Sequence, residues 1–294
     1  MSENAAPAQW DGDRVARWLR QSAGIERQLA PVSEMLFAAA RLQPGETVLD
    51  VGCGAGPTTF AAARAVGASG RVRGLDVSAD MLAAAAAAAP TDPDAAAIEW
   101  VTADAVTWQP DAVHDVVISR FGVMFFSDPA AAFTNLATAT RTGGRLTSAV
   151  WQRRDESAVF SVPFHAVLGV FRDYGITSTA DGVDLNDVMA TEDEGPFSLH
   201  DPASVTSLLE DAGWCDVEIE PHTLSLQFAG GVPPAAAAAA AVDFGPTRIV
   251  LAGQSDDVLR AAEDAIRDAF THHVDGDGHV VLSGSINIVS ARRR

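Results

Sequence analysis

The chain has 294 residues, of which 48% are hydrophobic, which is enough for one sizeable core with a cap over it. Its formal net charge is −19, and it contains no lysine, so all 20 basic residues are arginine. Nucleic acid is bound through clustered basic side chains that neutralise phosphates, so this balance argues against an RNA or DNA partner. The absence of lysine also excludes Schiff-base chemistry and a P-loop phosphate site.

The sequence shows no sign of a membrane span, a disulfide framework or a metal site. No apolar stretch of 18 residues is flanked as a span, and the first residues lack the basic-then-apolar pattern of a signal peptide. The two cysteines, Cys53 and Cys215, form no disulfide pattern, and no His, Cys, Asp or Glu cluster has metal-ligand spacing. We therefore expect a cytoplasmic protein with neither a membrane partner nor a metal.

The first elements are two helical patterns between Trp10 and Arg41, which we expect Pro31 to separate. The next element, Val48–Val51, is predicted to be a short buried parallel strand. It leads into glycines at three alternate positions, Gly52, Gly54 and Gly56, and then into a helix that begins at Pro57. Such a loop lets a ligand lie against bare backbone beside the positive end of a helix, which indicates a nucleotide-like cofactor.

Asp50 distinguishes between two classes of cofactor. A dinucleotide site favours G-x-G-x-x-G and a pyrophosphate at the helix N-terminus, whereas here the glycines alternate and Asp50 would repel a pyrophosphate. An acid there suits a ligand with an ammonium group, such as the methionine end of S-adenosylmethionine. In these residues the chain resembles the class I S-adenosylmethionine-dependent methyltransferases, in particular the bacterial small-molecule branch related to quinone-biosynthesis methyltransferases.

The resemblance continues along the next strands. Arg71–Asp76 is predicted to be a strand, and Ser78 is expected to cap the helix after it. Asp76 lies 20 residues after Gly56, and the family's matching acid binds both ribose hydroxyls, a bidentate contact that one carboxylate can make. Met81 matches an apolar position that packs on the adenine in the family.

Three further strands complete the predicted core. The segment 98–105 is a predicted strand that includes Asp104, whose family equivalent receives the adenine amino group. The fourth strand, His114–Ser119, precedes Arg120–Phe126, which resembles the family's loop between cofactor and substrate. The fifth strand is predicted to start at Gly143 and to end at Trp151, although the family's usual proline before the glycine pair is Thr142 here.

The fold class follows from the alternation of helical and strand patterns, which predicts an α/β protein with a parallel sheet. The resemblance implies a Rossmann-like, mostly parallel seven-stranded sheet with helices on both faces. It also implies an N-terminal helical lid at 1–41, a cofactor-binding core at 42–151 and a substrate cap at 152–200. Residues 201–294 would complete the core, with a helical insertion at about 230–273.

Near the C-terminus, a helix is predicted from Asp201 through Ala212 and a strand over Cys215–Glu220. Residues 280–290 are predicted to be the last strand, and the resemblance implies that it pairs antiparallel. The segment 275–278 is predicted to be a turn before it, and 292–294 a solvated tail.

Two sets of site residues follow. The predicted cofactor-binding residues are Asp50, Gly52, Cys53, Gly54, Gly56, Asp76, Val77, Met81, Asp104, Ala105, Ser119 and Arg120. The predicted substrate-pocket residues are Trp10, Trp18, Phe121, Met124, Trp151 and His165. Arg120 could pair with a substrate carboxylate or with Asp128, and the sequence leaves both open.

The sequence also suggests candidates for a general base, which a neutral hydroxyl acceptor would need. His165 is the first candidate because it follows Pro163 and Phe164 among apolar residues of the predicted cap; a packing or surface position is the plain alternative. His200, directly before the helix that starts at Asp201 and Pro202, is the second.

We predict a methyltransferase that uses S-adenosyl-L-methionine to methylate an O, N or C nucleophile of a small, fairly apolar organic molecule in specialised metabolism. Alignment of acceptor and methyl group can contribute roughly 7–11 kcal/mol. One alternative keeps the cofactor for non-methyl chemistry such as cyclisation, and another is a non-catalytic binding module. A homodimer is left open, and a dehydrogenase is the weakest alternative.

Overall fold

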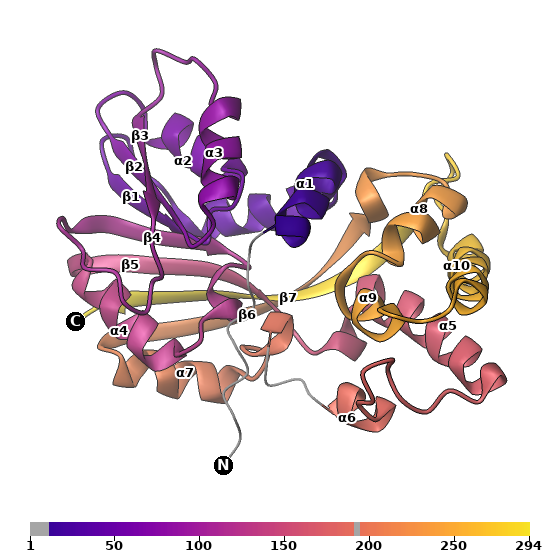
Figure 1. Cartoon of the computed structure of the whole chain (residues 1–294). Coiled ribbons are helices and arrows are strands. Elements are labelled where there is room, and N and C mark those ends of the chain that lie inside the picture. The colour runs from indigo at the N-terminus through magenta and orange to yellow at the C-terminus, as the bar shows by residue number, and fades with distance from the viewer. Residues whose placement is uncertain (1–11, 191–194) are drawn as a thin grey trace.

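The computed structural model of the chain describes residues 12–190 and 195–294, in which seven strands form one sheet in the order β3-β2-β1-β4-β5-β7-β6 (Figure 1). The first five pair in parallel, and β7 inserts antiparallel between β5 and β6. The strands are β1 Thr47–Val51, β2 Arg71–Asp76, β3 Ala97–Thr102, β4 His114–Arg120, β5 Thr140–Trp151, β6 Trp214–Gln227 and β7 Val281–Arg293. The predicted mostly parallel seven-stranded sheet is confirmed.

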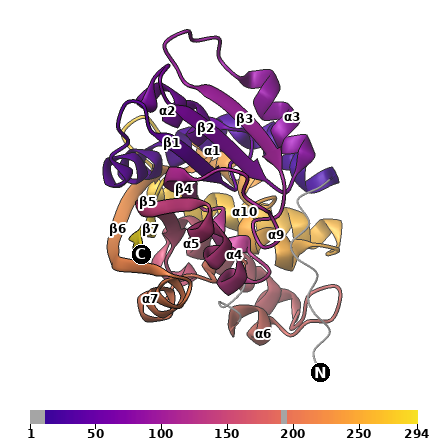
Figure 2. The ribbon, with the colours of Figure 1, turned by 90° about the vertical axis from the view of Figure 1, so that its left-hand side faces the viewer.

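Helices surround this sheet, and the second view shows them on both of its sides (Figure 2). Their bounds are α1 Gly12–Ala40, α2 Pro57–Val66, α3 Ala79–Ala88, α4 Pro129–Thr138, α5 Ala158–Tyr174, α6 Leu185–Ala190, α7 Pro202–Asp211, α8 Pro234–Ala241, α9 Gly245–Leu251 and α10 Asp256–Phe270. The caps expected from the sequence are present, because Ser78 accepts a hydrogen bond from the Met81 amide and Asp201 from the Ser204 amide.

The core has two parts, one on each face of the sheet, because successive side chains of a strand point to opposite faces. Val48, Val72 and Val116 belong to one buried cluster, together with residues of α2 and the end of α1. Leu49, Leu75 and their neighbours on the opposite face belong to a larger cluster that extends through α4 and α7 into the cap. The two insertions expected at 152–200 and 230–273 form one lobe there, since α5 packs against α9 and α10 (Figure 1).

The expectation that Pro31 divides the N-terminal helix is wrong. α1 runs unbroken from Gly12 to Ala40 with Pro31 inside it. An interior proline costs about 3 kcal/mol. However, Leu29, Val32 and Leu36 are all buried beside it, and each such side chain contributes roughly 1.5–3 kcal/mol. Burial on both sides of the proline therefore outweighs its cost.

Three strand boundaries also differ from expectation. β6 continues to Gln227, past Pro221. It is an edge strand, and a proline is tolerated on such a strand because no neighbouring strand on the outer side needs its missing N–H. β5 starts at Thr140 and accommodates 141–144 as an irregularity opposite β4. β7 reaches Arg293, so the segment 292–294 is not a solvated tail; the Arg293 guanidinium donates to the carbonyls of Ala137 and Gly213.

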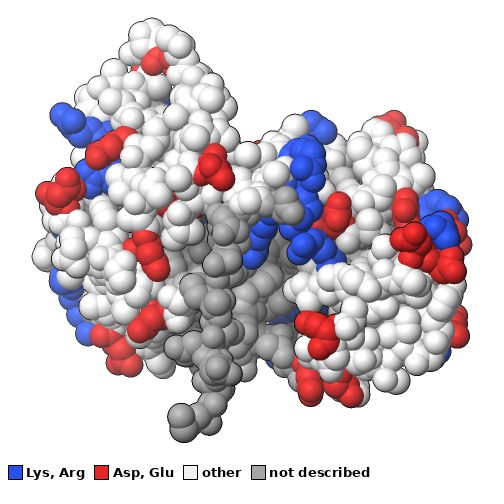
Figure 3. All heavy atoms as spheres, in the orientation of Figure 1, with Lys and Arg blue, Asp and Glu red and all other residues white. Residues whose placement is uncertain are grey.

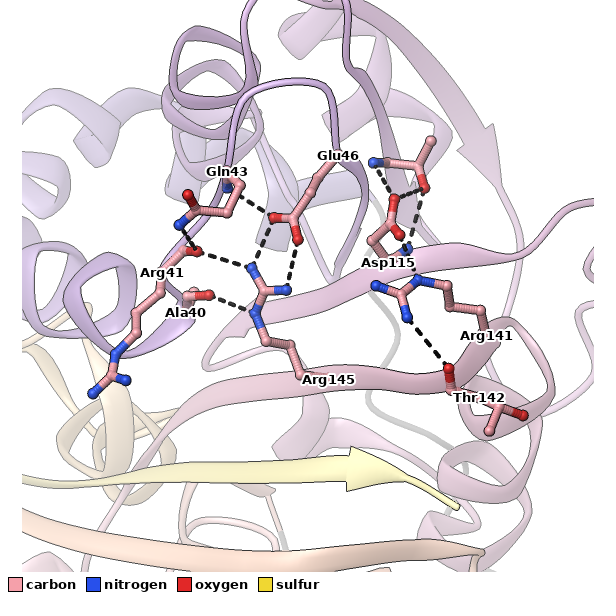
Figure 4. A network of polar contacts seen from close by, with 9 residues as sticks. Ala40, Arg41, Gln43, Glu46, Asp115, Arg141, Thr142 and Arg145 are labelled. Atoms are coloured by element: carbon pink, nitrogen blue, oxygen red, sulfur yellow. Dashed lines mark hydrogen bonds and ion pairs between the residues drawn. The ribbon is translucent and has the colours of Figure 1, made fainter.

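An arginine network closes the edge of the sheet where β1 and β4 begin, away from the glycine loop (Figure 4). Arg145 on β5 pairs with Glu46 at 2.7 Å and donates to the carbonyl of Ala40, which satisfies the end of α1. Asp115 accepts from the Thr47 amide at 2.8 Å and from Arg141 at 2.6 Å. These contacts fix the amino-terminal ends of the strands and hold α1 on the sheet.

Candidate active site

A cavity of about 390 Å³ opens at the carboxyl ends of β1, β2 and β4, under α1. Its size is in the range of ligand pockets, and its position is where open α/β sheets bind ligands. Nine predicted cofactor residues line it: Gly52, Cys53, Gly54, Asp76, Val77, Met81, Asp104, Ala105 and Arg120. Of the predicted substrate residues, Trp18 and Phe121 line it too.

The glycine loop lies against the loop after β4 at Gly52 and is open to the cavity at Gly54. A Cβ on Gly52 would lie 2.6 Å from the Cα of Gly122, so only glycine fits between the loops that follow β1 and β4. A Cβ on Gly54 would meet nothing within 4 Å. Both have positive φ, which glycine adopts without strain. The loop therefore presents bare backbone to the cavity at Gly54.

Asp50 lies behind this loop and does not reach the cavity surface. Its side chain is fully buried, and its Oδ2 accepts hydrogen bonds from the hydroxyls of Thr58 at 2.7 Å and Thr59 at 2.6 Å. Its Oδ1 has no hydrogen-bond partner among the described residues. Burial raises the Asp50 pKa to about 6. Asp50 therefore anchors the start of α2 and leaves one carboxylate oxygen unpartnered, and its contact with a cofactor stays a prediction.

Asp76 joins the glycine loop to α3. Its Oδ2 accepts from the Gly54 amide at 2.8 Å and its Oδ1 from the Ser78 amide at 2.9 Å. Burial raises its pKa, although the amides of Ser78 and Gly54 act in the opposite direction. Each oxygen keeps a second lone-pair direction, so the carboxylate can still accept from a ligand.

Asp104 stands two residues beyond the end of β3, whereas the sequence had predicted it within that strand. Its Oδ1 accepts from the Val106 amide at 2.9 Å, which orients the carboxylate at the cavity wall. Met81, buried on the first turn of α3, and Ala105 provide apolar surface on the same side. This part of the cavity combines an acceptor with a flat apolar bed, which suits an adenine ring.

Arg120 pairs with α1 and not with Asp128, one of the two partners that the sequence left open. Its guanidinium pairs with Glu26 at 2.6 Å and donates to the Ser33 hydroxyl at 2.8 Å, both on α1. Asp128 instead caps α4, accepting from the Ala131 amide. Glu26 lines the cavity as well, and no feature of the sequence had singled it out.

The charges around the cavity fit a cationic nucleoside. The charged lining residues are Glu26, Asp76, Asp104 and Arg120, three acids against one base, and the unpartnered oxygen of Asp50 lies close behind. Such a wall repels a pyrophosphate and attracts a sulfonium or ammonium group. The residues present therefore fit S-adenosylmethionine and disfavour a dinucleotide.

Two other predicted cofactor residues support the loops without lining the cavity. Ser119 is buried; its hydroxyl donates to the Val51 carbonyl at 2.8 Å and accepts from the Gly122 amide at 3.2 Å. Gly56 adopts a left-handed conformation at the N-cap of α2. These residues hold the two loops in register.

An aromatic wall closes the cavity toward the cap. Phe121 stacks on Trp151 with 4.3 Å between ring centroids, and Trp151 meets Phe160 edge-on at 4.9 Å. Trp151 and Met124 are buried behind Phe121, so they support the wall without lining the cavity; the Trp151 amide donates to the Met124 sulfur. Trp10 lies outside the described residues.

Several lining residues were missed by the sequence reading. They are Ser22, Ala23 and Glu26 of α1, Phe60 of α2, and Phe125, Phe126 and Ser127 after β4. Phe125 and Phe126 lie inside the segment already identified as a site loop, so its aromatic run was the available signal, and Ser127 follows it directly. The α1 residues carry no local signal, because they reach the cavity only through packing of the whole helix.

The structure brings neither candidate base to the cavity. His165 is exposed on α5, where its ring meets only the edge of Phe164. His200 hydrogen-bonds the Phe197 carbonyl through Nδ1 at 2.9 Å. None of the described residues that line the cavity is a histidine.

Two further findings concern the described residues as a whole. None of the helices between residues 12 and 294 combines the length and apolar character needed to cross a membrane. Within the same described ranges, no group of three or more His, Cys, Asp or Glu side chains is arranged to hold a metal ion.

Residues 48–144 match a family model described as a methyltransferase domain, Methyltransf_25. Aklanonic acid methyltransferase DauC of Streptomyces sp. (strain C5) is 34% identical over 117 residues, 40% of this chain and 53% of that protein. Nocamycin O-methyltransferase of Saccharothrix syringae is 32% identical over 134 residues, 46% of this chain and 47% of that protein. The chain thus spans about half the length of these curated relatives.

Solved structures agree on the fold. A putative methyltransferase from an antibiotic biosynthesis pathway of Anabaena variabilis superposes with a TM-score of 0.57 at 15% identity, over 90% of this chain and 99% of that one. The YcgJ protein of Bacillus subtilis gives a TM-score of 0.53 at 16% identity, over 90% and 99%. At such identities the likeness shows the fold alone. The family match thus shows a methyltransferase domain over residues 48–144, and the solved structures show that the chain shares the fold of such proteins.

Proposed function

We propose that this chain transfers a methyl group from S-adenosyl-L-methionine to an O, N or C nucleophile of a small, fairly apolar organic molecule. One observation carries the proposal: a single cavity combines an open glycine backbone, an excess of carboxylates and an aromatic wall. The first two features suit a cationic nucleoside, and the third suits an apolar acceptor.

Each part of the cofactor would have its own residues. Asp76 would hold the ribose hydroxyls, Asp104 the adenine amino group and Met81 the face of the adenine, while the loop at Gly54 would meet the methionine portion. When bound, the cofactor supplies an electrophilic methyl group. The carboxylates keep their acceptor oxygens in place through bonds to the amides of Gly54, Ser78 and Val106, so little reorganisation is needed on binding.

The remaining task of the protein is to align the acceptor and exclude water. Trp18, Phe121 and Phe125 provide apolar surface for this purpose, and the Glu26–Arg120 pair holds the lid helix over the cavity. Holding reacting atoms near contact distance contributes roughly 7–11 kcal/mol. A carbon or phenolate nucleophile that is already activated needs no further base, which suits a cavity lined by no described histidine.

The relatives support a role in specialised metabolism. Two carry names that refer to aklanonic acid and nocamycin. A third is a 2-phytyl-1,4-naphtoquinone methyltransferase of Synechococcus elongatus, 32% identical over 42% of this chain and 60% of that protein. We extend to this chain only the common feature, a small organic acceptor, and propose a cytoplasmic enzyme. A net charge of −19 supports the absence of a nucleic-acid partner.

The test combines binding with transfer. Calorimetry should show binding of S-adenosylmethionine and its demethylated product and no binding of NAD. A cofactor labelled in the methyl group, incubated with a panel of small phenols, carboxylic acids and quinols, should then place label in a product. Asp76→Asn serves as the impaired control. Binding without label in any product, but with a changed acceptor, would favour cyclisation; no binding of either cofactor form would reject the proposal.

A further inference from the structure

A second cavity lies on the other side of α1 from the cavity of about 390 Å³ described above, the cofactor cavity. It has a volume of about 310 Å³ and is lined by α1, the short 3-10 turn Phe228–Gly230 after β6, α8 and Phe244. Figure 1 shows α1 lying between the sheet and the helices of the cap, so each side of this helix can face its own cavity. The volume is large enough for a small organic ligand.

The spacing of residues along α1 explains the two cavities. Ser22 and Glu26 are four residues apart, so they lie along one stripe of the helix, and both line the cofactor cavity. Arg20 and Arg27 are seven residues apart, so they lie along another stripe, and both line the second cavity. Ala23 lines both cavities. The two sites are therefore separate but have one helix as a common wall.

The second cavity is cationic although the protein is strongly acidic. None of the described residues that line it is an acid, whereas the sequence has 39 acidic residues against 20 arginines. Figure 3 shows basic side chains gathered over α1, between the sheet half of the molecule and the cap. Among the described residues Arg20 has no hydrogen-bond or ion-pair partner, and Arg27 donates only through its Nε, to the Gly230 carbonyl at 3.1 Å. Both guanidinium groups therefore keep donors for a ligand.

A buried amide in the same lining also keeps a donor. Gln28 is 5% exposed, and its Oε1 accepts from the Ala229 amide at 2.8 Å. Its amide nitrogen donates to no group in the part of the chain that the structure describes. A buried donor without an acceptor costs free energy, so an acceptor atom bound in the cavity would be stabilised there. Ala229, which also lines the cavity, has a φ of 50°, a conformation rare for alanine and typical of residues at ligand sites.

The rest of the lining is largely apolar, and aromatic rings connect it to the cofactor cavity. Phe228 and Phe244 line the second cavity. Phe244 stacks on Phe160 with 6.0 Å between ring centroids, and Phe160 meets Trp151 edge-on. Trp151 in turn stacks on Phe121, which lines the cofactor cavity. The walls of the two cavities are therefore joined by packed rings as well as by α1.

We infer that the second cavity binds a small organic anion with an aromatic or aliphatic body. Arg20 and Arg27 would hold the anionic group, because guanidinium groups stay charged and can bind a carboxylate through two parallel hydrogen bonds. Gln28 would donate to a polar atom beside that group, and Phe228 and Phe244 would pack on the body. Two ligands share this chemistry: an acceptor that enters beside α1, or an effector that fixes α1 against the cap.

The experiment compares acids with their neutral amides. The cofactor-free protein is titrated in a calorimeter with 2-naphthoate and 2-naphthamide, and with 4-phenylbutyrate and its amide. We expect at least one acid to bind about tenfold more tightly than its amide, the scale of one charge-assisted hydrogen bond. Raising the salt concentration should weaken binding of the acid and leave binding of the amide unchanged.

Variants then locate the preference. Arg20→Gln should reduce the affinity for the acid severalfold, and the double variant with Arg27→Gln should bind acid and amide alike. Ala240→Trp on α8 fills the cavity without changing its charge, so it should weaken binding of both. Arg64→Gln is the matched control, because Arg64 is exposed on α2 without an ion pair to any described residue and its loss changes the net charge equally.

A cofactor labelled in its methyl group distinguishes the two kinds of ligand. An acid that gains label, and gains less in Arg20→Gln, is an acceptor. An acid that gains none but changes the affinity for the demethylated cofactor is an effector. In both cases a preference that the double variant removes confirms the site.

The inference is overturned if no acid is preferred over its amide, or if the double variant or Ala240→Trp binds the acid as the wild type does. Affinity for the demethylated cofactor, measured on every variant, shows that each has folded. If that cofactor does not bind to wild-type protein, the proposed function fails while the anion site stands or falls on its own titrations.

Discussion

The two sides of the cavity are built from different chemistry. The sheet side consists of backbone amides and carboxylates, and each carboxylate is placed by residues within about two dozen positions of it in the sequence. The side formed by α1 and the cap consists largely of aromatic rings contributed by α1, the segment after β4, the end of β5 and α5. The two sides therefore depend on different parts of the sequence. Short local segments specify the side that we expect to bind the cofactor, and long-range packing specifies the side that we expect to bind the acceptor.

The largest expected effect tests whether the cap side depends on its aromatic packing. Phe160 on α5 is 3% exposed and meets Trp151, Phe197 and Phe244. Phe160→Ala should lower the free energy of unfolding by about 3–5 kcal/mol, because it leaves a cavity among rings. Urea denaturation measures this loss. Phe160→Leu should lose less, and a loss below about 1 kcal/mol for the alanine variant would show that the cap can collapse around the gap.

A second test concerns the unpartnered carboxylate on the sheet side. Burial raises the folded-state pKa of Asp50 to about 6, from its ordinary value of 3.8. The contribution of Asp50 to the free energy of unfolding of the cofactor-free protein should therefore be most favourable below pH 4. It should become less favourable as the pH rises through 6. A rise in pKa from 3.8 to about 6 corresponds to at most about 3 kcal/mol in the free energy of unfolding.

The check is the difference between wild type and Asp50→Asn. Urea denaturation of both proteins from pH 4 to pH 7 should show wild type losing stability relative to the variant as the pH rises. Other titrating groups cancel in this comparison. A difference that stays constant with pH would mean that Asp50 is not desolvated in the free protein.

Asp76 carries the most direct test of cofactor recognition. Asp76→Ala removes a charged acceptor and the bonds that fix Gly54 and Ser78, so binding of S-adenosylmethionine should weaken by about 1.5–3 kcal/mol. Calorimetry gives the value, and Asp111→Asn, an exposed acid on the same half, is the control. Unchanged affinity would mean that the ribose is held elsewhere.

Gly24 connects the lid to the cap, and its substitution tests how tightly. A Cβ at this position of α1 would lie 2.6 Å from the Ala229 carbonyl oxygen. Gly24→Ala should therefore cost about 1–3 kcal/mol in unfolding free energy despite alanine's helix preference. Gly169→Ala on α5 is the matched control, since a Cβ there meets only Arg172 at 4.0 Å, and it should stabilise by about 0.5–1 kcal/mol. Equal effects at the two sites would show that α1 shifts freely against the cap.

The smallest expected effect concerns His165. Because its side chain is exposed and away from the cavity, His165→Ala should leave turnover within about twofold and the free energy of unfolding within about 0.5 kcal/mol. Steady-state kinetics with an identified acceptor measures the first quantity. A large loss of turnover would require α5 to move toward the cavity during the reaction.

The sequence predicted well those features that depend on short segments. The strand before the glycine loop, the helix start at Pro57, the cap at Ser78 and the place of Asp76 at the end of its strand are all as expected, because each is set by neighbours in the chain. Asp50 lies where β1 meets the loop, as expected, but its burial could not be predicted from the sequence because it depends on how α2 packs over it. The contact between Glu26 and Arg120 joins residues 94 positions apart, so no local sequence pattern could predict it.

The cap illustrates the same limit at larger scale. His165 follows a sequence typical of a pocket wall, yet its position on the outer side of α5 depends on how that helix packs on α9 and α10. The helix through Pro31 and the strand through Pro221 are both exceptions to the rule that proline interrupts regular structure. Burial of the neighbouring side chains allows the first, and the position of β6 at the edge of the sheet allows the second.

The place of β7 has a consequence for synthesis of the protein. Among the described strands β6 pairs only with β7, and β7 comprises residues 281–293. While the ribosome is still making the preceding residues, β6 has no neighbouring strand, and β5 has an open edge where β7 will lie. A nascent chain therefore carries two unpaired edges until its final strand emerges, and this interval is when it is most exposed to aggregation and most in need of a chaperone.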